Sequence, residues 1–132
     1  MLGELESNGR FVICDLEAGI GPVVRSERAD VVLAVTEPTV KSIEVARRAV
    51  EIAAEHAPVV VIANRVRTDE DVDAVRAVLG DQDLVVVPEE PGIAAADRDG
   101  AAPIDTAPDS VGVRAIVALA ERLGERAPAV AA

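Results

Sequence analysis

The sequence predicts an α/β fold in three layers: a mostly parallel sheet of about four strands, with helices on both of its faces. Half of the residues are apolar and only 1% are aromatic, a composition typical of aliphatic strands packed against alanine-rich helices. Four short runs rich in valine and isoleucine lack polar alternation, as expected for strands covered on both faces. Helical patterns separate the last three runs, which predicts parallel pairing through right-handed crossovers. The runs are residues 11–14, 31–35, 59–63 and 84–87.

Two predicted helices have recognisable boundaries. The first extends from Thr39 to about residue 57. The second begins at Thr68, which forms a variant capping box with Asp71, and it stops at Gly80. Apolar residues at spacings of three and four predict the buried faces of both helices. These residues are Val40, Ile43, Ala46, Val50 and Ala53 in the first helix, and Val72, Val75 and Leu79 in the second.

A last helix is predicted from about residue 109 to residue 123. The segment before it, residues 91–108, contains proline and glycine, which predict a short turn of helix followed by a loop. The expected inward positions of the last helix are Val113, Ile116, Val117, Ala120 and Leu123. We expect one domain over residues 1–125 and a flexible tail, rich in alanine and proline, at residues 126–132.

Composition and charge argue against several classes of partner. The formal net charge is −11, which repels phosphate backbones and anionic membranes, so we expect neither nucleic acid nor a membrane as partner. The sequence shows no signal peptide and no apolar stretch long enough to span a bilayer. Cys14 is the single cysteine, and we expect it to pack as a small apolar residue in the first strand. These features fit a cytoplasmic protein.

Polar residues follow the predicted strands at their carboxyl ends, where ligands collect in parallel sheets. These residues are Asp15, Glu37 and Asn64, with Pro88 after the last strand. A carboxylate at the position of Asp15 can hold Mg²⁺ through water. Aspartate is also a common residue at the start of loops, so this reading stays open against a purely structural one.

Asn64 carries an amide that can donate to and accept from the edge of an adenine base. The alternative is that Asn64 only caps the turn after its strand. The string Asn64-Arg65-Val66-Arg67 differs from the Asn-Lys-x-Asp motif of guanine-reading loops, because arginine offers no acceptor to the base. If a base is read here, adenine is therefore favoured over guanine.

Four segments in order resemble the C-terminal half of the MinD/ParA-like ATPases, which belong to the deviant P-loop (SIMIBI) class. The segments are FVICDLEAG, ADVVLAVTEPTVKSIEVARR, VVVIANRV and LVVVPEEPGIAAADRDG. Within this class, the Asp-x-Glu-Ala-Gly string is most similar to the carbon monoxide dehydrogenase maturation ATPases, which assist nickel insertion. The resemblance spans residues 11–124 and implies a partial P-loop NTPase fold.

The resemblance also implies roles for individual residues. The position of Asp15 supports the water shell of magnesium, and the turn from Glu17 to Gly19 senses the nucleotide. The position of Asn64 contacts adenine, and the segment Pro88–Gly92 lines the base pocket. The residues expected to bind the nucleotide are therefore Glu17, Gly19, Asn64, Arg65, Pro88 and Glu89, with Asp15 as the metal residue.

The sequence departs from this pattern in two respects. It contains no lysine-bearing glycine loop for phosphate and no Cys-x-Cys pair for nickel. Hydrolysis depends on preorganised positive charge at the transferring phosphate. We therefore expect weak or partner-dependent binding of ATP or ADP with magnesium, and no hydrolysis by this chain alone. The alternative is a non-catalytic module that keeps the fold and binds a protein partner.

The absence of the phosphate-loop strand has a structural consequence. In the resembling fold that strand lies between the strands matching residues 11–15 and 31–36. Here these two strands are expected to pair directly in a four-stranded sheet, or to recruit another chain through self-association or a protein partner. A phospho-receiver domain, which needs a lysine at the end of a late strand, is disfavoured because the only lysine is Lys41, inside a predicted helix.

Overall fold

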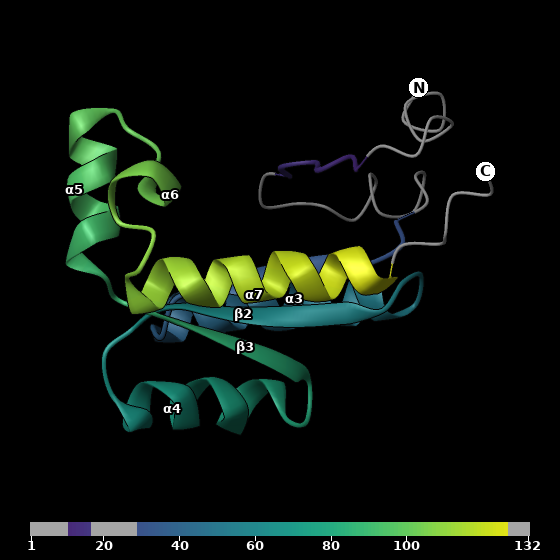
Figure 1. Ribbon diagram of the computed structural model, residues 1–132. Helices are drawn as coiled ribbons and strands as arrows, with labels where there is room; N and C mark the ends of the chain where they lie inside the picture. Colours follow the sequence, from purple (N-terminus) through teal and green to yellow (C-terminus); the bar gives the residue numbers. More distant parts are fainter. Residues whose placement is uncertain (1–10, 17–28, 127–132) are drawn as a thin grey trace, which may run out of the picture.

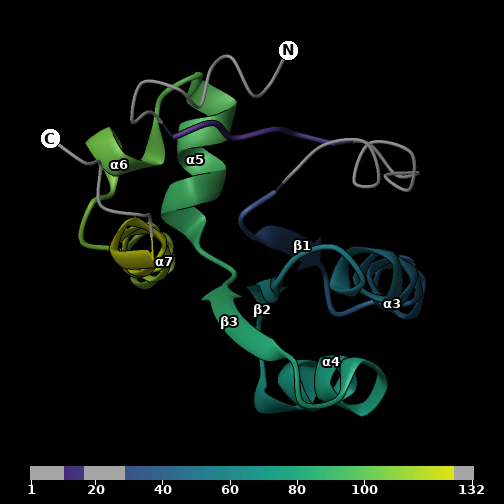
Figure 2. The same ribbon diagram turned by 90° about the vertical axis from the view of Figure 1, so that its right-hand side faces the viewer.

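Three parallel strands in the order β1-β2-β3 form the sheet of the computed structural model, which describes residues 11–16 and 29–126. Helices α3 and α4 cover one face of the sheet and α7 covers the other, so the predicted three-layer α/β architecture is confirmed (Figures 1 and 2). The elements are β1 (Val32–Thr36), α3 (Val40–Ala54), β2 (Val59–Val66), α4 (Asp69–Leu79), β3 (Asp83–Pro88), α5 (Pro91–Asp99), α6 (Pro103–Thr106) and α7 (Val111–Arg126).

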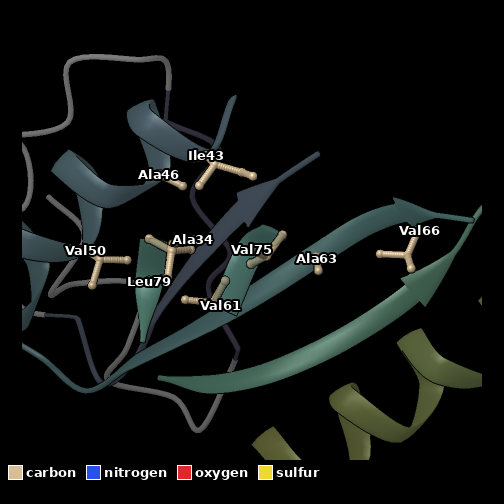
Figure 3. Packing of buried hydrophobic residues seen from close by; sticks show 9 residues of the cluster. All are labelled: Ala34, Ile43, Ala46, Val50, Val61, Ala63, Val66, Val75 and Leu79. Carbon is tan, nitrogen blue, oxygen red and sulfur yellow. The ribbon is translucent and has the colours of Figure 1, made fainter. Parts of the chain in front are cut away.

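The larger core lies between the sheet and helices α3 and α4 (Figure 3). Side chains of β2 alternate between the two faces: Val61 and Ala63 join this core, whereas Val60 and Ile62 pack toward α7. Burial of one such valine or isoleucine stabilises the fold by about 1.5–3 kcal/mol. β2 is therefore the central strand of the hydrophobic core on both faces.

The turn from β1 into α3 is fixed by a chain of hydroxyl groups. Thr36 is only 1% exposed, and its hydroxyl lies 3.1 Å from the hydroxyl of Ser42. The Ser42 hydroxyl also accepts a hydrogen bond from the backbone N–H of Glu37 at 2.9 Å. Thr39 caps the helix by accepting from the backbone N–H of Ser42 at 3.3 Å. The prediction that Val40 faces the core is wrong: as the first residue of α3 it is 89% exposed.

Helix α4 has the predicted capping box. The Asp71 carboxylate accepts from the backbone N–H of Thr68 at 3.3 Å, and the Thr68 hydroxyl accepts from the backbone N–H of Asp71 at the same distance. The helix ends at Gly80, whose φ of +66° suits glycine. This helix and its buried residues Val75 and Leu79 agree with the sequence analysis.

The predicted strand at residues 11–15 is wrong, and the described sheet has three strands instead of four. Residues 11–16 form no regular structure and are exposed, with Ile13 at 92%. Cys14 is likewise exposed and does not pack in a core. An apolar run becomes a strand only where a neighbour satisfies its backbone hydrogen bonds, and no described strand pairs with this segment. The segment lies beyond the β1 edge of the sheet (Figure 2).

The C-terminal helices differ from the predictions in detail. Residues 91–108, predicted as a turn of helix and a loop, contain both α5 and α6, which project from the end of the sheet (Figure 1). In α7, Ala115 and Leu119 pack on the sheet, whereas the predicted inward residue Ile116 is 46% exposed and Ala120 is exposed. The reason is that α7 packs mainly on β3 and leaves part of its apolar stripe uncovered.

Some predictions fall outside the described residues. Arg126 ends α7, but the rest of the predicted tail, residues 127–132, is not described, and neither are Glu17 and Gly19. No helix among the described residues is long and apolar enough to cross a membrane.

Candidate functional site

A shallow hollow of about 120 Å³ lies at the carboxyl ends of the strands. We call it the strand-end hollow. Most of its lining side chains are polar or charged, and they come from the β1–α3 turn, the end of β2 and the residue after β3. The lining residues are Glu37, Pro38, Thr39, Arg65, Arg67 and Glu89.

Arg65 occupies an irregular point in the sheet. The register of β2 on β3 shifts between Asn64 and Val66, so that Arg65 is the extra residue of a β-bulge. Its φ of +57° lies in the left-handed region, which costs a non-glycine residue about 1–2 kcal/mol. Such strain often marks a functional position.

Ion pairs of Arg65 and Arg67 join the three strand ends. The Arg65 guanidinium lies 3.2 Å from Glu37 Oε1 and 3.6 Å from Glu89 Oε1. Arg67 Nε lies 3.7 Å from Glu89 Oε2. All four side chains are largely exposed, so each pair contributes only about 0–1 kcal/mol to stability. The positive charge at the hollow is matched by negative charge.

Asn64 does not line the strand-end hollow. It is half-buried, and alternation along β2 places it on the α7 face with Val60 and Ile62, beside its register partner Val87. Among the described residues its side-chain amide makes no hydrogen bond. Pro88 also lies outside the lining. The structure therefore brings Arg65 and Glu89 together but leaves Asn64 on the α7 face of the sheet, outside the hollow.

The segment Pro88–Gly92, predicted to line a base pocket, is packed against α7 and α6. Glu90 accepts a weak hydrogen bond from the backbone N–H of Gly112 at 3.5 Å, at the start of α7. A Cβ added to Gly112 would lie 3.0 Å from Glu90 Cβ, and one added to Gly92 would lie 2.8 Å from Ala107 Cβ. This segment is a tight joint between β3 and the C-terminal helices.

Asp15, the predicted metal residue, does not line the strand-end hollow. Asp15 lies in the exposed segment 11–16, and the described residues contain no group of three or more potential metal ligands. Magnesium is normally held by one or two carboxylates together with substrate phosphates. The role predicted for Asp15 would therefore depend on phosphates from a bound nucleotide.

Sequence reasoning missed Thr39 and Arg67 in the lining of the hollow. Opposite charges at neighbouring strand ends were the available signal, since Glu37, Arg65 and Glu89 all follow or end adjacent parallel strands. Among the described residues, the most strongly perturbed carboxyl lies away from the hollow: a hydrogen bond from Arg47 on α3 lowers the pKa of Glu44 to about 2.

Comparison with known proteins identifies the fold. No family model matches this chain, and no curated protein matches it. Among solved structures, the chain is similar to the MinD cell division protein of Aquifex aeolicus, with a TM-score of 0.62 and 24% identity. The match covers 86% of this chain but 49% of that protein, so the chain spans about half of its length. The likeness shows a partial MinD-like P-loop fold.

Proposed function

We propose that this chain provides the base-side part of an adenine-nucleotide site on a MinD-like fold. It binds ATP or ADP weakly, or only with a partner that supplies the phosphate contacts. The observation that carries the proposal is the bulge after Asn64 at the carboxyl end of the central strand. There Arg65 is strained, and the Asn64 amide makes no hydrogen bond among the described residues.

The chemistry of Asn64 suits adenine. An asparagine amide can donate to one atom and accept from the next on the adenine edge, which is the pairing used for this base elsewhere. Asn64 is half-buried, and its amide is not engaged by another described side chain. The carboxylates of Glu37 and Glu89 in the strand-end hollow, which would favour the donors of guanine, are paired with Arg65 and Arg67.

The phosphate side has weaker support. Arg65 and Arg67 are neutralised by their carboxylate partners, and the described residues contain no group of three or more potential metal ligands. The strand-end hollow, at about 120 Å³, is smaller than the roughly 300 Å³ at the lower end of ligand pockets. The described residues therefore offer no cluster of free positive charge to a transferring phosphate, and we expect no hydrolysis by this chain alone.

The nearer similarity to the carbon monoxide dehydrogenase maturation ATPases rests on the Asp-x-Glu-Ala-Gly string at residues 15–19. From this similarity we infer common ancestry with those ATPases. We do not infer a role in nickel insertion, because the sequence has no Cys-x-Cys pair. A nucleotide-dependent role of this kind fits the cytoplasm, where a single unpaired cysteine is usual.

Calorimetric titration of the full chain with Mg·ATP, Mg·ADP and Mg·GTP tests the proposal. We expect adenine nucleotides to bind with a Kd between about 1 μM and 1 mM, and GTP to bind more weakly. Asn64→Ala is expected to weaken ATP binding at least tenfold, or about 1.4 kcal/mol. Gln82→Ala is the matched control, because it removes an amide at the opposite end of the sheet.

Two results would overturn this function. One is the absence of any binding heat for ATP, ADP and GTP up to millimolar concentration. The other is equal loss of binding in the Asn64 and Gln82 variants. Either result favours the second candidate function, a non-catalytic interaction module. The exposed apolar residues Leu33 and Val35 at the sheet edge support that alternative.

A further inference from the structure

The outer edge of β1 has no partner strand among the described residues, where β1 pairs only with β2. Natural sheets guard such edges with charged side chains, proline or bulges, because open backbone groups recruit other strands. The sequence of β1, VLAVT, contains none of these features, and its pairing with β2 is regular. The edge is therefore able to accept a further strand.

One face of β1 is also uncovered. Ala34 and Thr36 are buried toward α3, but Leu33 is 38% exposed and Val35 is 61% exposed. Val35 pairs in register with Ile62, which packs toward α7, so these exposed side chains lie on the α7 face of the sheet. Helix α7 packs on β3 and leaves this side of the face open (Figure 2).

The chain also contains an exposed apolar segment, residues 11–16, that pairs with no described strand. Residues 11–16 read FVICDL, and they lie beyond the free edge of β1 (Figure 2). Phe11 is 69% exposed and Ile13 is 92% exposed. In an extended strand these two side chains fall on one face, where they can extend the apolar surface formed by Leu33 and Val35.

We propose that a second copy of this chain adds its segment 11–16 as a fourth strand to the free edge of β1, and receives the same addition in return. Such reciprocal pairing is a closed twofold contact, which stops at the dimer. In the single chain both surfaces stay exposed, so the second copy is the partner that covers them. The inference does not depend on nucleotide binding.

Charge and size favour a weak dimer of this kind. Of the eleven residues concerned in each copy, only Asp15 is charged, whereas 28% of the whole chain is charged. Loss of charge at the centre is characteristic of interfaces. A stable interface uses about 20–30 residues on each side, so eleven residues predict a transient contact with a Kd between about 1 μM and 1 mM. Each copy carries a net charge of −11, so added salt should strengthen the dimer by screening repulsion.

Sedimentation velocity of the full chain over a range of concentrations tests the proposal. We expect a monomer–dimer equilibrium that shifts toward dimer as salt is added. Val35→Lys and Ile13→Lys each place a charge in the contact at an exposed position, and each is expected to raise the dissociation constant at least tenfold. Val78→Lys is the control, because Val78 is 46% exposed on α4, which covers the opposite face of the sheet.

Hydrogen exchange at low and high protein concentration locates the contact. We expect concentration-dependent protection in residues 11–16 and in β1, with circular dichroism confirming that all three variants fold. A chain that stays monomeric to about 1 mM, or protection of residues 11–16 in the monomer, would overturn the proposal. So would a dimer that the Val35 and Ile13 variants leave intact, or open-ended growth into larger species.

Discussion

Strands β1 and β2 are neighbours of similar composition in very different surroundings. β2 pairs on both sides, and its residues Val60 and Val61 are completely buried. β1 pairs on one side, and Val35 is 61% exposed although its register partner Ile62 is 6% exposed. Apolar composition predicts a strand, but the number of its partners determines how far it is buried. Residues 11–16 are the limiting case, since they have the composition of a strand but no partner strand within residues 29–126.

The largest expected effect compares this register pair directly. Ile62→Ala leaves a cavity between the sheet and α7, and should lower the free energy of unfolding by about 2–5 kcal/mol. Val35→Ala, on the same face of the neighbouring strand, should lower it by at most about 0.5 kcal/mol, because surface substitutions change stability little. Chemical denaturation at low protein concentration measures both values in the monomer. Similar losses in the two variants would mean that the open face of β1 is covered in solution.

A second comparison concerns the two ends of α7. Gly112→Ala forces a Cβ to within 3.0 Å of Glu90 Cβ and of Ile93 Cδ1, and such overpacking should cost about 1–3 kcal/mol. Gly124→Ala meets no atom within 4 Å and should stabilise the helix by up to about 1 kcal/mol. Thermal unfolding of the two variants should therefore move in opposite directions. If Gly112→Ala were also stabilising, the joint between residue 90 and α7 would be looser than described.

Most of the fold could be predicted from the sequence because its signals are local. Alternation of apolar runs with helical periodicity predicted all three strands of the sheet, and Thr68 with Asp71 predicted the start of α4. The failures involve contacts between distant parts of the chain. The sequence of residues 11–14 does not indicate that this segment leaves the edge of β1 unpaired. The sequence of α7 does not indicate that the helix packs mainly on β3 and leaves Ile116 exposed.

The candidate site was predicted less completely. Glu37 was expected at the carboxyl ends of the strands from its position after a parallel strand, and it lines the strand-end hollow together with Arg65 and Glu89. The bulge could not be foreseen, because it depends on how β2 and β3 align. It places Val66 in the same core as Ala63, which regular alternation over three residues would not do. The packing of Gly92 and Gly112 was also hidden, since it depends on where α6 and α7 return to the end of β3.

The smallest expected effect tests how much the left-handed backbone of Arg65 in the β2 bulge destabilises the fold. Arg65→Ala keeps the left-handed backbone and loses two exposed ion pairs, so it should lower the free energy of unfolding by about 1 kcal/mol or less. Arg65→Gly loses the same pairs but relieves a strain of about 1–2 kcal/mol, part of which is offset by the greater freedom of glycine in the unfolded chain. The glycine variant should therefore be more stable than the alanine variant, by about 1 kcal/mol, in urea denaturation. Equal stability would mean that β2 straightens when the arginine is removed, and that the Arg65 ion pairs hold the bulge in place.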